Sequence, residues 1–138
     1  MSDSSLRVLL AEQSLPYRRV IREALTAFRQ CEVDDTPSAE HAFQTALQRR
    51  HVLYIFALTL PDMRGDMLDR LLSVAVPRVH TGLHSAPPVI FLLRPEESTQ
   101  WQELSRHARV RGHLFIPPRL DQLLQATAAL LPERSPLG

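Results

Sequence analysis

The chain of 138 residues contains no lysine, a single cysteine and few aromatic side chains, which make up 6% of the sequence. All 16 basic residues are therefore arginines, and any chemistry that requires a lysine amine is excluded. The lone Cys31 cannot form an internal disulfide or a cysteine-based zinc cluster, so we expect it to be a small core residue. The net charge of only +1 argues against a dedicated nucleic-acid-binding protein.

Long hydrophobic runs are also missing from the chain. No stretch approaches the roughly 20 apolar residues that a membrane-spanning helix needs. The sequence opens with polar and acidic residues, whereas a secretory leader would be basic and then apolar. We therefore expect a cytoplasmic protein that neither associates with membranes nor binds nucleic acid directly. The apolar share of 44% is ordinary for one globular domain of this length.

Short apolar runs alternate with helically spaced apolar residues along the chain. This alternation predicts an α/β domain with a doubly wound, five-stranded parallel sheet flanked by five helices, over residues 6–131. Residues 1–5 are expected to be an N-terminal tail, and residues 132–138 a C-terminal tail or the start of a linker. The predicted strands are residues 6–11, 31–33, 52–58, 89–93 and 112–116, and the predicted helices are approximately residues 15–28, 37–47, 65–75, 95–109 and 120–131.

The third helix has an apolar stripe that predicts its buried side. Its inward residues are expected to be Met67, Leu68, Leu71 and Leu72, which recur at helical spacing. The fourth helix has a much thinner stripe. Because sites in parallel sheets form outside the carboxyl ends of the strands, the residues that follow each predicted strand are the first to consider for function.

Four stretches, in order along the chain, resemble the receiver domain of two-component response regulators. The resemblance covers residues 6–131 and implies a flavodoxin-like fold with a cis peptide bond between Ile116 and Pro117. The matching stretches are Val8-Leu9-Leu10-Ala11-Glu12-Gln13, Leu60-Pro61-Asp62-Met63-Arg64-Gly65, Pro88-Val89-Ile90-Phe91-Leu92, and Val110-Arg111-Gly112-His113-Leu114-Phe115-Ile116-Pro117 followed by Arg119-Leu120-Asp121-Gln122-Leu123-Leu124.

The resemblance also implies where a phosphorylation site would lie, and the residues there have changed. Ala57 replaces the phosphoacceptor aspartate, Leu93 the hydroxyl residue and Ile116 the lysine. The acidic pair that holds magnesium becomes Glu12 and Gln13. A methyl group cannot act as a nucleophile, and one carboxylate is a poor magnesium site. We therefore expect a degenerate site without metal or cofactor, closed by apolar side chains, with Glu12 at the rim, hydrated or paired with an arginine.

Two other groups of residues are candidate sites. Asp62 and Asp66 follow the third strand, but a displaced carboxylate lacks the in-line geometry for phosphotransfer. For Asp66 we favour a structural role, in which it caps the third helix or interacts favourably with the helix dipole. His80 and His84 have the spacing of two metal ligands on a helix, yet a proline and a glycine interrupt that segment. We interpret the histidines as part of a polar surface loop.

The resemblance implies an interaction face on the fourth helix, fifth strand and fifth helix, which is the usual docking and dimerisation surface of receiver domains. His113 lies at the position of the aromatic switch residue, and tryptophan is enriched in interface hot spots. We expect a protein partner or a second copy of the chain to bind there. The alternative is an ordinary solvated face. The candidate interface residues are Arg94, Trp101, Arg106, Arg111 and Arg119.

The leading hypothesis for function is a phosphorylation-independent pseudo-receiver that acts as a signalling and regulatory interaction module. One alternative is the N-terminal regulatory domain of a longer transcription factor or signalling enzyme. Another is a small-molecule-binding domain that uses the former phosphorylation pocket. An enzyme is least favoured, because no nucleophile–base pair remains at the strand ends.

Overall fold

The structure is a computed structural model that describes residues 6–135. Its five parallel strands form one sheet in the order β2-β1-β3-β4-β5. This order confirms the predicted fold class, and it makes β2 and β5 the edge strands. The strands are β1 (Arg7–Ala11), β2 (Glu32–Thr36), β3 (Leu53–Ala57), β4 (Val89–Leu93) and β5 (Val110–Phe115).

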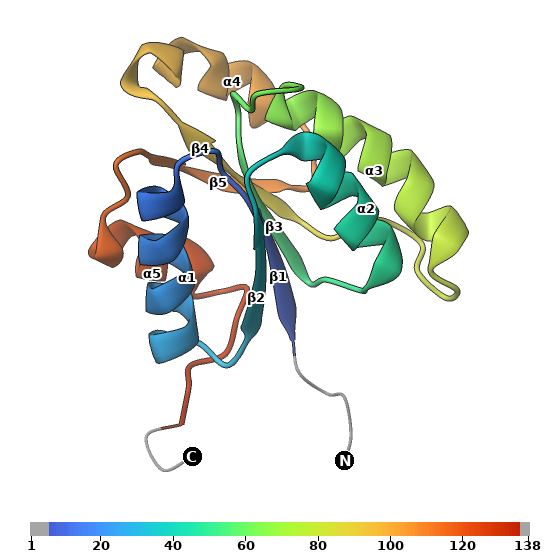
Figure 1. The fold of residues 1–138 in the computed structure, drawn as a ribbon, viewed down its shortest axis with the longest axis horizontal. Helices are drawn as coiled ribbons and strands as arrows, with labels where there is room; N and C mark the ends of the chain where they lie inside the picture. Colours follow the sequence, from blue (N-terminus) through green and yellow to red (C-terminus); the bar gives the residue numbers. More distant parts are fainter. Residues whose placement is uncertain (1–5, 136–138) are drawn as a thin grey trace.

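Helices cover both faces of the sheet (Figure 1). One face is covered by α1 (Leu15–Phe28) and α5 (Leu120–Thr127), and the other by α2 (Ala39–Gln48) and α3 (Gly65–Val79). The 3₁₀ helix η1 (Pro95–Gln100) and the short α4 (Trp101–Leu104) lie on the side of α3. No helix within residues 6–135 is both long and apolar enough to cross a membrane.

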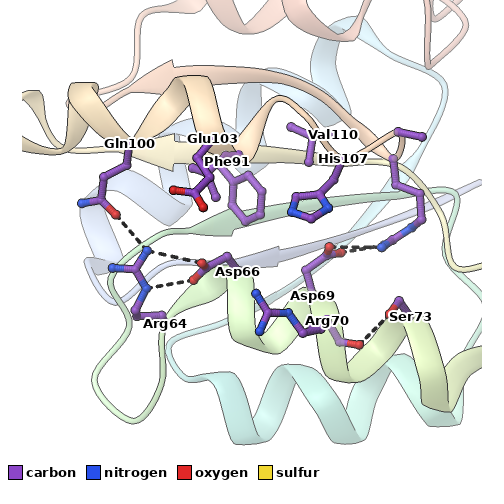
Figure 2. A pocket seen from close by; sticks show the side chains of 13 residues that line it. Arg64, Asp66, Asp69, Arg70, Ser73, Phe91, Gln100, Glu103, His107 and Val110 are labelled. Atoms are coloured by element: carbon purple, nitrogen blue, oxygen red, sulfur yellow. Dashed lines mark hydrogen bonds and ion pairs between the residues drawn. The ribbon is translucent and has the colours of Figure 1, made fainter.

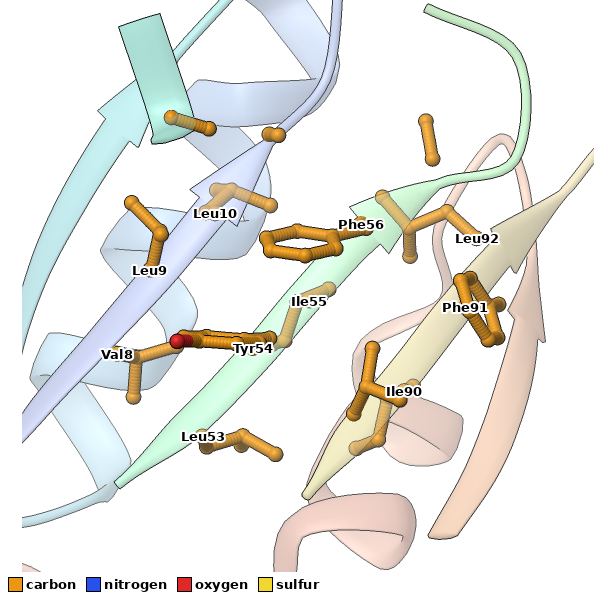
Figure 3. Close-up of a cluster of buried hydrophobic side chains, with 14 of the residues drawn as sticks. Val8, Leu9, Leu10, Leu53, Tyr54, Ile55, Phe56, Ile90, Phe91 and Leu92 are labelled. Atoms are coloured by element: carbon orange, nitrogen blue, oxygen red, sulfur yellow. The ribbon is translucent and has the colours of Figure 1, made fainter. Parts of the chain in front are cut away.

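The three central strands form the middle of the core (Figure 3). Every residue of β3 and β4 is buried, because helices pack on both faces of these strands. Their sequences are therefore almost continuously apolar rather than alternating. Tyr54 and Phe56, two residues apart on the same face of β3, stack with ring centroids 4.9 Å apart.

The edge strand β2 is longer than the predicted strand at residues 31–33, because two aspartates extend it. Asp34 and Asp35 are charged residues that apolar periodicity assigns to a loop. In the structure their carboxylates are neutralised by side chains from β1, α1 and the segment after α2. Asp34 pairs with Arg7 and Arg49, both at 3.0 Å, and Asp35 pairs with Arg18 at 3.0 Å and Arg22 at 2.7 Å. The His51 Nε2 also lies 2.8 Å from an Asp34 carboxylate oxygen, at hydrogen-bond distance.

The predicted helix at residues 95–109 is much shorter in the structure. A 3₁₀ helix of six residues leads into an α4 of only four, and turns follow. Within α4 only Leu104 is buried, so a longer helix would gain little by packing. By contrast, α3 continues past the predicted end at residue 75 to Val79, with Pro77 inside its last turn.

The described part of the expected C-terminal tail is hydrogen-bonded to the end of α1. The Pro132 carbonyl accepts a hydrogen bond from the Gln30 N–H at 2.8 Å. The Arg134 N–H donates to the Phe28 carbonyl at 3.1 Å, and its Nε to the Thr26 carbonyl at 2.7 Å. Residues 132–135 therefore pack against the domain, whereas α5 ends at Thr127 rather than at the predicted residue 131.

Candidate functional site

Three apolar residues lie together where β3, β4 and β5 end. Ala57 ends β3, Leu93 ends β4 and Ile116 follows β5. The parallel register sets Ala57 beside Leu92, and the Ile116 N–H donates to the Leu93 carbonyl at 2.9 Å. All three are buried, with exposed fractions of 3%, 0% and 8% respectively. None of these alkyl side chains can attack a phosphoryl donor or hold an anion.

Glu12 lies at the same edge of the sheet, but it is not at the rim as predicted. It is only 4% exposed. One carboxylate oxygen, Oε2, accepts a hydrogen bond from the Ser14 N–H at 2.8 Å, while Oε1 has no hydrogen-bond partner within residues 6–135. The nearby Arg18 forms an ion pair with Asp35 instead. Burial raises the pKa of Glu12, and the hydrogen bond from Ser14 offsets only part of this effect.

A second carboxylate, from Glu97 of η1, occupies this region and was not predicted. Its Oε1 accepts a hydrogen bond from the Arg94 N–H at 2.7 Å, and its Oε2 accepts one from the Thr59 hydroxyl. The Glu97 charge is among the causes that raise the pKa of Glu12. The sequence did contain a signal for this role of Glu97. Pro95 is followed by Glu97 at the third helical position, which is the spacing of a capping box.

Comparison with solved structures identifies the fold, although no protein-family model and no curated protein matches the sequence. The REC domain of AraT, a response regulator from Geobacillus stearothermophilus, gives a TM-score of 0.75 at 23% identity, over 91% of this chain and 92% of that one. The chemotaxis response regulator CheY4 of Vibrio cholerae gives 0.72 at 19% identity, over 93% of this chain and 100% of that one. The signal receiver domain of an HD domain-containing protein from Pseudomonas fluorescens gives 0.74 at 18% identity, over 91% and 94%.

The chain has the receiver fold. Its Ile116–Pro117 peptide bond is cis, which confirms the expectation from the family resemblance. Of the positions that the resemblance assigns to the receiver phosphorylation site, Gln13 is exposed, whereas the other four are buried at the carboxyl edge, namely Glu12, Ala57, Leu93 and Ile116.

Asp62 and Asp66, the two acids that follow β3, form hydrogen bonds and an ion pair within the fold. The Asp62 carboxylate accepts hydrogen bonds from the N–H groups of Ala39 and Glu40, both at 2.9 Å, and so caps the start of α2. Burial would raise the pKa of Asp62, but these two hydrogen bonds, together with one from its own backbone N–H, outweigh burial and lower the pKa. Asp66 lies in the first turn of α3 and forms an ion pair with Arg64 at 3.0 Å.

The predicted interaction face contains a row of aromatic rings at the β5 edge. The Trp101 and His113 ring centroids lie 4.2 Å apart, and those of His113 and Phe115 lie 5.2 Å apart. Trp101 is half-buried against the core, and Phe115 is 37% exposed. Partial burial lowers the pKa of His113. The predicted arginines Arg94, Arg106, Arg111 and Arg119 are all exposed.

His80 and Cys31 are both buried in the receiver fold. His80 is not on a surface loop as predicted: its Nε2 lies 2.8 Å from the Ala46 carbonyl, between α2 and the end of α3. His84 is exposed, and residues 6–135 contain no group of three histidine, cysteine or acidic side chains placed to hold a metal ion. Cys31 is 5% exposed in the core, and burial raises the pKa of its thiol.

Proposed function

We propose that this receiver-fold domain is a pseudo-receiver, which regulates signalling by binding another protein surface without being phosphorylated. The main support is the buried methyl group of Ala57 at the position that the resemblance assigns to the phosphoacceptor. The adjacent Leu93 and Ile116 supply neither a hydroxyl group nor an ammonium group. A phosphoryl group at this edge would also face Glu12 and Glu97, whose carboxylates are both buried there.

The first prediction is that acetyl phosphate does not phosphorylate the domain. Without a carboxylate at position 57 there is no acceptor for the phosphoryl group, and Glu12 alone cannot replace a two-carboxylate magnesium site. Intact-mass measurement after incubation with acetyl phosphate and magnesium should show no added phosphoryl group. An acid-labile gain of one phosphoryl group would contradict the proposal.

Restoring the acidic residue tests whether the old pocket is truly closed. The double variant Ala57→Asp with Ile116→Lys should lose about 2 kcal/mol or more of folding free energy, because it places charge in a buried edge. Ala57→Asn with Ile116→Met is the matched control for side-chain size without charge. We expect neither variant to be phosphorylated efficiently. Full stability of the charged variant together with ready phosphorylation would show that the edge is still a receptive polar pocket.

The proposed docking face consists of α4, β5 and α5 together with Arg94, Arg106 and Arg119. Because β5 is an edge strand, its outer edge is not covered by another strand. The aromatic row lies beside arginines and acidic side chains, and Arg119 and Asp121 are separated by 3.4 Å while remaining 69% and 71% exposed. A face with both signs of charge and exposed aromatic area can pair with a second copy of itself.

The third prediction is that Trp101→Ala and Arg111→Ala weaken self-association. Sedimentation velocity over a wide concentration range should show the wild type forming dimers at lower concentration than either variant. Arg78→Ala, an exposed arginine on α3 away from this face, is the control and should match the wild type. The thermal midpoint should change little. A loss of about 3–5 kcal/mol in Trp101→Ala, typical of a large core deletion, would instead identify Trp101 as a core residue.

A further inference from the structure

A cleft of about 440 Å³ lies between α3 and the α4 segment, away from the apolar strand ends. It exists because α4 is so short: after Leu104 the chain turns toward β5 without continuing a helix alongside α3. Its volume is near the lower end of the range of about 300–1,000 Å³ that is typical of small-molecule sites. A ligand the size of a dinucleotide is too large for it, and a small metabolite is not.

The cleft has an apolar base and charged walls. Glu103 and His107 come from the α4 side of the cleft, and side chains of α3 lie opposite them. Figure 2 shows the ring of Phe91, a β4 residue, between Glu103 and His107. Phe91 is 1% exposed and Leu104, which also lines the cleft, is 6% exposed. The wall formed by α3 carries Asp69 and Arg70. A ligand in this cleft therefore meets apolar groups below and charges on both sides.

Most of these charges are already neutralised within the domain. Asp69 forms a bidentate ion pair with Arg109, with N–O distances of 2.6 and 3.1 Å. Arg64 pairs with Asp66 at 3.0 Å and also donates to the Gln100 side chain at 2.8 Å.

Two side chains of acidic or basic type that line the cleft have no ion-pair partner within residues 6–135. These are Arg70 on α3 and Glu103 on α4, which have opposite charges and come from opposite walls. The remaining ionisable side chain in the cleft is His107, on the same wall as Glu103.

We infer that this cleft binds a small zwitterion, namely a free α-amino acid with an apolar side chain. The ligand carboxylate pairs with the Arg70 guanidinium, whose fork of donors matches a carboxylate. The ligand ammonium pairs with Glu103, and the side chain packs on the apolar lining, to which the exposed Ala108 and the half-buried Val110 contribute accessible surface. A purely anionic ligand would place a negative charge beside Glu103, and a purely cationic one would place a positive charge beside Arg70. The bound ligand would link α3 to α4 whether or not the domain docks a partner.

L-Leucine is the probe for this cleft, compared with two analogues that each lack one charge. 4-Methylpentanoate lacks the ammonium group and L-leucinamide lacks the carboxylate, while both keep the apolar side chain. Titration of ¹⁵N-labelled domain should give saturable shifts in α3 and in residues 101–110 with L-leucine, and at least about tenfold weaker binding for each analogue, as expected when a charged hydrogen bond is lost. Equal binding of all three, or no saturable shifts with L-leucine, would overturn the inference.

Matched variants show whether the two walls recognise the ligand. Arg70→Gln and Glu103→Gln should each weaken L-leucine binding by about tenfold or more. The controls are Arg78→Gln on the same helix and Glu96→Gln on η1, which are exposed and lie outside the cleft. All four substitutions are at exposed positions, so thermal midpoints should stay near that of the wild type. Equal weakening by the controls, or none by the cleft variants, would place the binding elsewhere.

Discussion

Replacing Gly65 with alanine is expected to destabilise the domain by about 3 kcal/mol or more, at the upper end of the usual cost of overpacking. Gly65 begins α3 directly beside the end of β3, and its N–H donates to the Leu58 carbonyl at 2.8 Å. A Cβ atom on Gly65 would lie 2.0 Å from the Ala57 carbonyl oxygen and 2.9 Å from the carbonyl carbon. Both are backbone atoms of a buried central strand, so neither can move aside without disturbing the sheet.

Gly112→Ala is the matched control for this prediction. Gly112 lies in β5, and a Cβ atom added there meets nothing within 4 Å. An alanine at this position should leave stability within about 0.5 kcal/mol of the wild type, as is usual for a surface substitution. Urea unfolding followed by circular dichroism measures both variants. If Gly65→Ala were as stable as Gly112→Ala, this result would show that α3 and β3 leave room for a Cβ atom at position 65.

The central strands could be predicted from the sequence because their environment is uniform. Residues 89–93 were predicted as a strand and are β4, and the prediction of 52–58 contains β3 with one extra residue at each end. Both faces of these strands are covered, so nearly every side chain is apolar and the run itself marks the strand. The edge strand β2 was predicted poorly because its aspartates depend on arginines from other elements.

The buried side of α3 shows where a single-helix pattern fails. Met67 and Leu71 were predicted to face inward, but they are 41% and 43% exposed. The buried side instead includes Asp69 and Val76. An apolar pattern cannot assign an aspartate to the interior, because its burial depends on Arg109, which lies 40 residues later in the chain.

The candidate site, like the fold, has features that the sequence predicts and features that it does not. The substituted positions Ala57, Leu93 and Ile116 could be located from motif order, since parallel strands bring their carboxyl ends to one edge. The charge of Glu97 close to Glu12 could not be predicted, because Glu97 lies 85 residues later in the chain. The cleft beside α4 depends on the absence of helical turns after Leu104, where the sequence had predicted a helix to residue 109.

Replacing Arg109 with methionine is expected to cost about 3 kcal/mol, near the lower end for breaking one partner of a buried ion pair, because the two side chains remain 22% and 11% exposed. In addition to its pair with Asp69, Arg109 donates from Nε to the carbonyls of Ala86 and Pro87 at 3.1 and 3.0 Å. Arg109 therefore links the loop before β4 to α3 through these hydrogen bonds and the ion pair. Arg111→Met, at an exposed position two residues away, is the control and should change stability by less than about 0.5 kcal/mol.

The pH dependence of this loss separates the ion pair from simple packing. Burial raises the pKa of Asp69 above its usual 3.8, and Arg109 opposes that rise. Without the guanidinium, the pKa of Asp69 in the folded variant rises further. The folded variant therefore holds a proton on Asp69 more tightly than the unfolded chain does. The stability that this proton contributes is lost as the pH increases through the folded-state pKa. The deficit of Arg109→Met relative to the wild type should therefore be largest near neutral pH and shrink on acidification toward pH 4, as measured by urea unfolding at each pH. A deficit that stays constant across this range would mean that Arg109 stabilises the domain through its carbonyl contacts and its alkyl chain, and not through the charge on Asp69.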